Sequence, residues 1–174
     1  MDFKKNKIAI IGPESSGKTT ISKELSNHFN ATYIEEYARV YLEKNGPGYT
    51  YSELEKLAKK QLELEKGENS KLLICDTNLL TYKIWSLYKY KKCSKWIINN
   101  LNLSTFNLHL ICFPDFQWEK DKLRENPSQI ERNEIFNIYK KELNVFKLDY
   151  ITLKGPHSKR LNYAINKINS LLKE

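Results

Sequence analysis

The sequence contains few cysteines and no long apolar run. Its three cysteines, Cys75, Cys93 and Cys112, include no C-x-x-C pair, which argues against a disulfide framework and against a zinc site. No stretch reaches ~18 apolar residues, so neither a membrane span nor a membrane partner is expected. The first seven residues lack the apolar core of a signal peptide, and we expect a cytoplasmic chain. Without repeats or a linker, residues 1–174 are predicted to form a single domain.

Arginine is scarce even though the chain is basic. The formal net charge of +8 favours anionic partners, and nucleotide phosphates are sufficient to account for it. Only four of the 29 basic residues are arginines, whereas the lysines are scattered along the chain as solvated surface charge. Such a chain is expected to keep arginine where a planar, bidentate guanidinium is needed. The residues predicted to contact phosphate or a functional carboxylate are Arg39, Arg124, Arg132 and Arg160.

Residues 12–19 read Gly-Pro-Glu-Ser-Ser-Gly-Lys-Thr, which fits the phosphate-binding P-loop pattern G-x-x-x-x-G-K-T. The motif lies between an apolar run that predicts a buried strand and a pattern that predicts a helix, so its backbone N–H groups surround a phosphate at the positive end of that helix. Lys18 is predicted to act on the outer phosphates, and the Thr19 hydroxyl to bind Mg²⁺. The predicted nucleotide-binding residues here are Gly12, Glu14, Ser15, Ser16, Gly17, Lys18, Thr19 and Thr20.

Strand-like runs alternate with helical patterns along the whole chain. Strands are predicted at 7–11, 32–35, 71–75, 107–112 and 149–153, and helices at 17–29, 36–44, 51–67, 77–90, 94–101, 130–144 and 158–172. This alternation predicts a three-layer α/β fold with a parallel five-stranded sheet covered by helices on both faces. Capping-box sequences at 52–55 and 128–131 mark two helix starts. Ligands of such sheets bind beyond the carboxyl ends of the strands, where candidate site residues should therefore lie.

Two acids follow the second predicted strand. Glu35 and Glu36 lie where a carboxylate accepts a proton from a substrate hydroxyl or binds a ribose, and Arg39 follows one helical turn later. The alternative is that both acids only favour the dipole at a helix start.

Asp76 ends the third predicted strand, after the apolar residues 72–75. An apolar strand ending in Asp is the Walker-B pattern, in which the carboxylate holds Mg²⁺ directly or through water. The alternative is an N-cap of the next helix, a role that Asp fills well.

The fourth strand leads into a polar segment, about 114–130, that we predict to be a lid over the phosphate donor. Arg124 and Arg132 would place positive charge on the transferring group, and Trp118 argues against a plain surface connection. After the fifth strand, Arg160 is predicted to stack on the nucleotide base. An ordinary turn with Ser158 as helix cap is the alternative there.

These motifs together resemble the ribosylnicotinamide kinase domain of NadR-type proteins. The resemblance rests on residues 12–20, Glu-Tyr-Ala-Arg at 36–39, Asp-Thr at 76–77, Pro-Asp-Phe-Gln-Trp at 114–118, and Asp-Lys-Leu-Arg at 121–124 with Arg132. It covers the chain from about residue 7 to the last helix. It implies a P-loop kinase fold with sheet order 2-3-1-4-5, and transfer of the ATP γ-phosphate to the 5′-hydroxyl of nicotinamide riboside. Family members tend to have glycine where this lid has Lys122.

The substrate that the resemblance implies carries a pyridinium cation, for which a site should offer aromatic faces and acids. Tyr37, Trp85 and Trp118 supply rings, and Glu35 and Glu36 supply charge. The expected partners are thus a nucleoside and ATP with Mg²⁺. The sequence leaves open whether Glu36 or Asp76 is the general base, whether ATP or GTP is the donor, and whether the chain forms a homo-oligomer.

Two other classes of function compete with this prediction. Another nucleoside or nucleotide kinase is possible, and Arg39 could then meet an acceptor monophosphate. A polynucleotide kinase or DNA-dependent ATPase would suit the charge of +8, but the only basic-aromatic tract on one predicted helix is 88–92, so a nucleic-acid partner is not favoured. A GTPase switch is disfavoured because no Asn-Lys-x-Asp motif is present.

Overall fold

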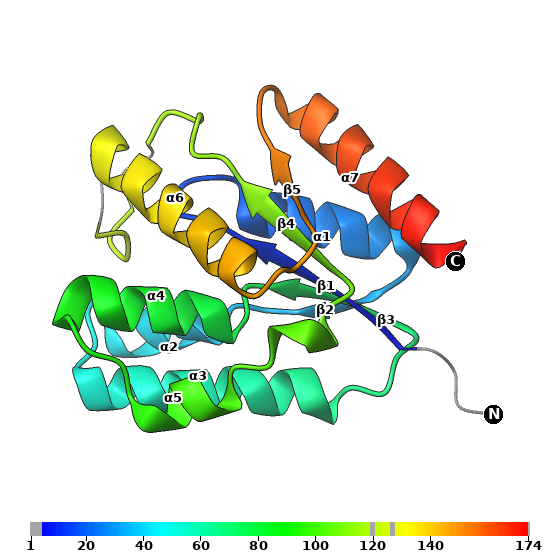
Figure 1. The fold of residues 1–174 in the computed structure, drawn as a ribbon. Coiled ribbons are helices and arrows are strands. Elements are labelled where there is room, and N and C mark those ends of the chain that lie inside the picture. Colours follow the sequence, from blue (N-terminus) through cyan, green and yellow to red (C-terminus); the bar gives the residue numbers. More distant parts are fainter. Residues whose placement is uncertain (1–4, 119–120, 126–127, 174) are drawn as a thin grey trace.

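One parallel sheet of five strands, in the order β2-β3-β1-β4-β5, forms the centre of the protein (Figure 1). It is seen in a computed structural model that describes residues 5–118, 121–125 and 128–173. The strands are β1 (Asn6–Ile11), β2 (Thr32–Ile34), β3 (Leu72–Asp76), β4 (Leu108–Cys112) and β5 (Tyr150–Leu153). The predicted α/β class, the parallel pairing and the strand order are confirmed.

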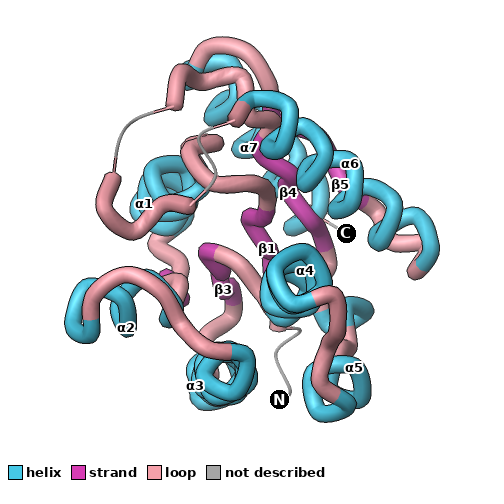
Figure 2. Tube along the Cα trace, turned by 90° about the vertical axis from the view of Figure 1, so that its left-hand side faces the viewer, coloured by secondary structure: helices cyan, strands magenta, loops and turns pink. Residues whose placement is uncertain are grey.

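Helices cover both faces of the sheet and give the fold three layers (Figure 2). One face carries α1 (Lys18–Phe29) and α7 (His157–Leu172), and the other carries α4 (Leu79–Tyr90) and α6 (Gln129–Val145). Strand β1 shows how the sequence produces this arrangement. Ile8 and Ile10 pack toward α1 and α7, whereas Ala9 and Ile11 pack toward α4 and α6. All four are fully buried, which explains why β1 has an apolar run instead of polar alternation.

A further group of helices packs against α4. It consists of α2 (Tyr37–Asn45), α3 (Tyr51–Gly67) and α5 (Lys95–Asn100), followed by a short 3₁₀ helix at Leu103–Thr105. Their shared apolar cluster includes Leu54 and Leu57 of α3, Tyr82 of α4 and Ile97 of α5. This packing fixes α3 beside the start of α2, where the chain leaves β2.

Helix starts show where local sequence rules hold and where they fail. Ser128 caps α6 as predicted, with its hydroxyl accepting from the Glu131 N–H at 3.3 Å. The predicted helix at 51–67 is confirmed as α3, but the capping box predicted at 52–55 is wrong, because the box is formed by Thr50 and Glu53, two residues earlier. Asn78, and not Asp76, caps α4. The N-cap alternative for Asp76 is therefore excluded.

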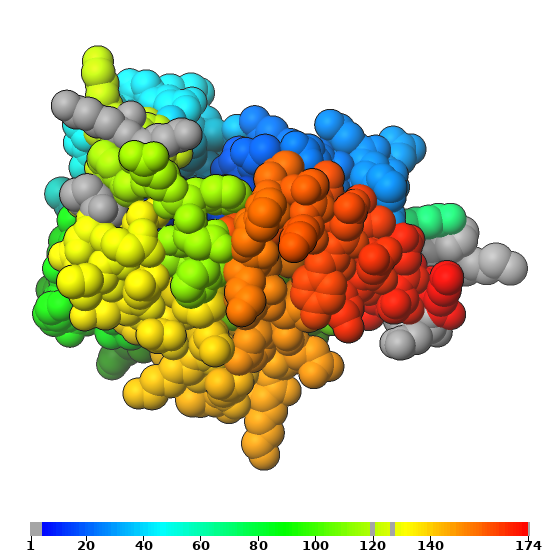
Figure 3. Space-filling view, turned by 90° about the horizontal axis from the view of Figure 1, so that it is seen from above, coloured from blue at the N-terminus to red at the C-terminus, as the bar shows by residue number. Residues whose placement is uncertain are grey.

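The carboxyl ends of the strands meet at one edge of the sheet, and the connection from β4 to α6 passes beside it. In Figure 3 the yellow-green residues of this connection lie next to the cyan surface of α2. Residues 119–120 and 126–127 of the predicted lid, 114–130, lie outside the described residues. Within the described part of the chain, no helix combines the length and the apolar character needed to cross a membrane.

Candidate active site

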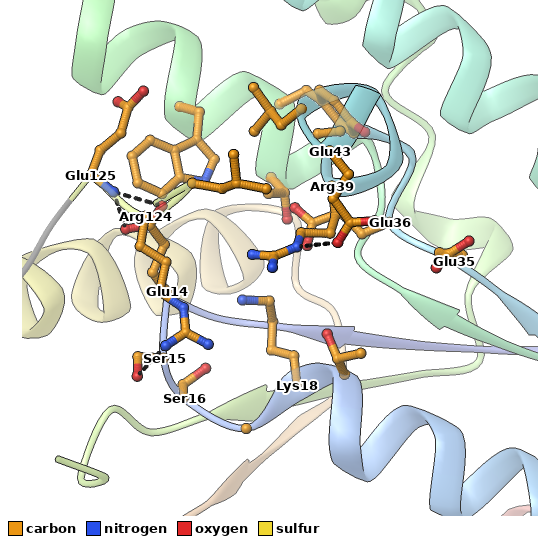
Figure 4. Close-up of a pocket in the computed structure, with 18 of the residues that line it drawn as sticks. Glu14, Ser15, Ser16, Lys18, Glu35, Glu36, Arg39, Glu43, Arg124 and Glu125 are labelled. Carbon is orange, nitrogen blue, oxygen red and sulfur yellow. Dashed lines mark hydrogen bonds and ion pairs between the residues drawn. The ribbon is translucent and has the colours of Figure 1, made fainter. Parts of the chain in front are cut away.

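A cavity of about 390 Å³ opens at the carboxyl edge of the sheet (Figure 4). It is lined by the P-loop, the start of α1, the β2–α2 junction, α4 and residues 123–125 of the predicted lid. Twelve of the predicted site residues line it, namely Glu14, Ser15, Ser16, Gly17, Lys18, Thr19, Thr20, Glu35, Glu36, Arg39, Trp85 and Arg124. Residues far apart in the sequence are thus brought together as the strand-end rule predicted.

The shape of the P-loop depends on two glycines. Gly12 has a φ of +141°, and a Cβ there would lie 2.6 Å from the Cys112 carbonyl oxygen. Gly17 has a φ of +83° and makes no side-chain cap, so the first N–H groups of α1 stay available to a phosphate. The Lys18 Nζ donates to the Pro13 carbonyl oxygen at 2.9 Å, which holds the ammonium inside the loop.

Arg160 braces the P-loop and does not line the cavity. Its guanidinium donates to the carbonyl oxygens of Ser16 at 2.9 Å and Phe113 at 3.1 Å, and it pairs with Asp115. The guanidinium carbon also lies 4.2 Å from the centre of the Phe116 ring. Because Arg160 is only 1% exposed, no face of the guanidinium remains for a base. The predicted stacking of Arg160 on the nucleotide base is therefore corrected to a structural role.

Arg132 is also buried outside the cavity lining. It donates to the carbonyl oxygens of Ser15 and Phe116 at 3.4 Å, and to the Gln129 side chain. Its side chain supports the backbone next to the P-loop in this conformation. A contact of Arg132 with the transferring phosphate stays a prediction.

Asp76 and Thr19 form a candidate Mg²⁺ site. Asp76 ends β3 beside Ile10, and its carboxylate is hydrogen-bonded by Thr19 and, at 3.2 Å, by the Tyr33 hydroxyl. Burial raises the pKa of Asp76, while the charge of Lys18 opposes the rise. Among the described residues Asp76 Oδ1 is buried without a hydrogen-bond partner. An orphaned carboxylate oxygen beside a hydroxyl suits a hard cation that keeps several of its waters, so the residues present fit Mg²⁺.

The carboxyl group of Glu36 lies in an environment that raises its pKa. Glu36 lies at the N-cap position of α2, yet its side chain makes no capping hydrogen bond. Burial raises its pKa to about 7, with the carboxylates of Asp76 and Glu14 adding to the rise and Lys18 opposing it. A pKa near neutrality is the value that suits a general base. Figure 4 shows Glu35 at the margin of the cavity, apart from Lys18 and Arg39.

The described part of the predicted lid contacts both walls of the cavity. Asp121 accepts from Arg39 of α2 at 2.8 Å, and it lies 3.8 Å from the Nε of Arg124. Arg124 in turn reaches the P-loop, since its Nη1 donates to the Ser15 hydroxyl at 3.3 Å. The Glu125 N–H donates to the Glu14 carboxylate at 3.0 Å. Arg39 and Arg124 thus both lie within ion-pair distance of the Asp121 carboxylate, while their contact with phosphate stays a prediction.

Two predicted aromatic residues lie elsewhere. Tyr37 packs its ring against the cluster of α3, α4 and α5, and it is not among the lining residues of the cavity. Trp118 is partly buried, does not line the cavity as described, and has an indole N–H without a partner among the described residues. Of the three predicted rings, the structure places that of Trp85 on the cavity wall.

Several residues of the site were not predicted. Tyr49 and Tyr82 line the cavity, Tyr33 bonds Asp76, and Gln61 bonds the β2–α2 junction. A signal for Gln61 was present in the sequence. The buried stripe of α3 runs through positions 54, 57, 58, 61 and 65, and two of these carry polar residues. Burying a polar side chain on an apolar stripe costs free energy unless the side chain is hydrogen-bonded, so such a residue indicates a specific hydrogen bond.

The fold and the site together define a P-loop domain of the kinase type. The chain belongs to the family described as an AAA domain, whose model matches residues 7–160.

Curated relatives agree with this assignment. The chain is 25% identical over 154 residues to the trifunctional NAD biosynthesis/regulator protein NadR of Escherichia coli strain K12, and equally to that of Salmonella typhimurium strain LT2. These matches cover 84% of this chain and 38% of each relative, so the chain spans well under half the length of these proteins.

Several solved structures have a similar fold. A NadR protein in complex with NR superimposes with a TM-score of 0.72 at 20% identity, over 96% of this chain and 49% of that one. A deoxyadenosine kinase from M. mycoides gives 0.67 at 19% identity, over 94% and 99% of the two chains. A thymidylate kinase from Ehrlichia chaffeensis gives 0.61 at 14% identity, over 94% and 98%.

Proposed function

We propose that this chain transfers the γ-phosphate of ATP to the 5′-hydroxyl of nicotinamide riboside, giving nicotinamide mononucleotide. In this proposal residues 1–174 act as one kinase domain with the lid at 114–130. The observation that carries it is the pairing of a P-loop with Glu36, a carboxyl group of near-neutral pKa, on the walls of one cavity. The match to NadR over 84% of this chain supports the choice of acceptor.

The donor end of the cavity is the P-loop. Backbone N–H groups at the start of α1 meet the β- and γ-phosphates, and Lys18 leaves the Pro13 carbonyl oxygen to bind the phosphate oxygens. A NadR structure with NAD and AMP-PNP shows that a protein of this fold holds an ATP analogue. Arg124 reaches the transferring group from the lid, where a fixed positive charge stabilises the transition state.

Thr19 and Asp76 would hold Mg²⁺ beside these phosphates. When bound, the ion neutralises charge that develops on the phosphate oxygens. Asp76 is a poor general base in this arrangement, because Thr19 and Tyr33 already hydrogen-bond its carboxylate.

Glu36 is then the base for the acceptor. It accepts the proton of the 5′-hydroxyl while that oxygen bonds to the γ-phosphorus. The bond from the γ-phosphorus to the bridging oxygen breaks, and ADP leaves. Trp85, Tyr49 and Tyr82 provide rings on the same cavity, with carboxylates nearby, and this environment favours a flat cationic ring.

The test is a competition assay in which equimolar nicotinamide riboside, adenosine, deoxyadenosine, cytidine, uridine and thymidine compete for ATP with Mg²⁺, with products read by mass. We expect nicotinamide mononucleotide to form first. We also expect Trp85→Leu to raise KM for nicotinamide riboside more than KM for ATP. Lys18→Ala is the inactive control, with kcat lower by about 10² or more.

Two results would contradict parts of the proposal. If another nucleoside is phosphorylated fastest, the kinase reaction stands and the acceptor is wrong. If no nucleoside is phosphorylated but single-stranded DNA stimulates ATP hydrolysis, the small-molecule kinase itself is wrong.

A further inference from the structure

Gln61 is a fully buried amide in the middle of α3, and it bonds the chain on both sides of Glu36. Its Oε1 accepts from the Tyr37 backbone N–H at 2.8 Å, and its Nε2 donates to the Glu35 carbonyl oxygen at 3.2 Å. The same Oε1 accepts from the Tyr82 hydroxyl at 3.2 Å. One side chain therefore holds the two peptide groups that flank Glu36 and also a tyrosine of the cavity wall.

The start of α2 explains why this contact matters. The first N–H groups of a helix have no partner inside it, and usually the N-cap side chain accepts from one of them. Glu36 lies at the N-cap with extended backbone angles, but its carboxylate makes no capping bond. Instead the Tyr37 N–H is bonded by Gln61, and the Ala38 N–H bonds the Tyr82 hydroxyl. These N–H groups are thus satisfied from α3 and α4.

We infer that Gln61, with Tyr82, caps α2 from outside and thereby leaves the Glu36 carboxylate free to face the acceptor. Gln61 is on this view a positioning residue for proton transfer and does not touch the substrate. The inference rests on the role of Glu36 in the proposed function.

A purely structural role for Gln61 makes a different prediction. Gln61 lies on the same buried stripe as Leu57 and Ala58, where an apolar side chain fills space without the cost of burying an amide. If Gln61 only packs the core, its replacement lowers stability and acts on activity independently of Glu36. If it positions Glu36, its effect on activity disappears once the carboxylate is gone.

The experiment is a double-mutant cycle with Gln61→Met and Glu36→Gln. Kinetics are measured on whichever nucleoside the wild-type protein phosphorylates fastest. Gln61→Met should lower kcat about tenfold or more in the wild-type background and by less than about twofold in the Glu36→Gln background. KM for ATP should stay within about twofold throughout, because the P-loop is not in contact with Gln61.

Two further variants separate positioning from folding. Leu57→Ala weakens the packing of α3 but keeps the hydrogen bonds of Gln61 and Tyr82 to the start of α2, so it should lower the melting temperature while reducing kcat at the assay temperature less than Gln61→Met does. Gln61→Glu keeps an oxygen for Tyr37 and Tyr82 but sets a carboxyl oxygen against the Glu35 carbonyl oxygen, so its kcat should also fall below that of the wild type. Equal losses of kcat in both backgrounds, or a loss in Leu57→Ala as large as in Gln61→Met, would overturn the inference.

Amide hydrogen exchange gives a second readout that needs no acceptor. In Gln61→Met the amides of 37–38 should exchange at least tenfold faster, whereas those of 12–18 should not change. Unchanged exchange at 37–38 would overturn the capping contact whatever the substrate. The wild type could fail to phosphorylate nicotinamide riboside while the effects of the two substitutions on kcat are non-additive with another nucleoside. In that case the proposed acceptor is wrong and the role of Gln61 stands.

Discussion

Arg39 and Asp121 form an ion pair, with 2.8 Å between Nη1 and Oδ2, that joins helix α2 to the lid. Arg39 also pairs with Glu43 on its own helix at 2.9 Å. The two carboxylates bond the same guanidinium, but only Asp121 connects it to the lid. Because each carboxylate can be replaced separately, the effect of the contact with the lid on ATP binding can be measured apart from the effect of Arg39 itself.

Asp121→Asn should loosen the lid. Both partners are partly exposed, with 40% and 21% of their side chains accessible, so the pair contributes no more than ~1 kcal/mol. We expect KM for ATP to rise by up to about fivefold, with a smaller rise at high salt, where the pair is already screened. The matched control is Glu43→Gln, which removes the other partner of Arg39 without touching the lid. Equal KM values in the two variants would show that the ion pair does not hold the lid.

Asp76→Asn should impair the Mg²⁺-dependent rate without lowering the stability of the fold. The amide keeps the size of the carboxylate and still accepts from Tyr33, but it has no charge for Mg²⁺. We expect kcat to fall by about 10² or more and the Mg²⁺ concentration for half-maximal rate to rise. The melting temperature should stay the same or increase, because burial already disfavours the charged carboxylate. Full activity at limiting Mg²⁺ would remove Asp76 from the metal site.

The pH dependence of kcat/KM should report Glu36. Its pKa of about 7 means that the group is mostly protonated at pH 6 and cannot accept a proton there. The rate should therefore increase from pH 6 to pH 8, with an acidic limb near pH 7 in the free enzyme. Glu36→Gln should remove this limb and lower kcat by about 10²–10⁴, whereas Glu35→Gln should keep it. A limb that persists in Glu36→Gln belongs to another group.

Glu65→Gln should stabilise the protein at alkaline pH. Burial raises the pKa of Glu65 from 4.5 to about 7 in the folded state, so the folded protein binds the proton more tightly than the unfolded chain. The free energy of unfolding therefore falls as the pH rises from about 4.5 to 7. At pH 8 the variant should gain roughly 1–3 kcal/mol in urea unfolding, and at pH 4 it should gain little. Exposed Glu63→Gln serves as control, and a gain of equal size at both pH values would exclude a titration effect.

Titration of His109 changes the free energy of unfolding in the opposite direction to Glu65, over nearly the same pH range. Burial lowers its pKa from 6.5 to about 4, so the unfolded chain binds the proton and the free energy of unfolding rises between those values. The two groups offset one another in the wild type. Glu65→Gln should consequently expose a rise in stability from pH 4 to 6.5 that is weaker in the parent protein.

Local sequence predicted those parts of the site that consist of consecutive residues. The P-loop is one strand, one turn and one helix start, and Asp76 follows directly from an apolar strand. The helix cap at Thr50 was missed because Ser52 carries the same pattern, and only the three-dimensional turn decides between the two. The partners of the arginines needed the fold itself. Arg160 and Ser16 are 144 residues apart, and no spacing rule connects them.

The positions of the aromatic residues could not be predicted from local sequence either. Tyr37 lies next to Glu36 in the sequence, yet the helical turn sends its ring into the cluster of α3, α4 and α5. Tyr49 belongs to the loop before α3 and still lines the cavity. Whether a ring faces the substrate depends on how α2 and α3 pack, which composition and periodicity do not specify.

The brace between Arg160 and the P-loop has a consequence for the order of events during synthesis. Ribosomes make the amino-terminal end first, at about 5–20 residues per second, so Arg160 is made roughly 7–30 s after Ser16. A nascent chain that ends before α7 contains the complete phosphate-binding motif without the guanidinium that supports the Ser16 and Phe113 carbonyl oxygens. The P-loop thus reaches its final geometry only after α7 has been added.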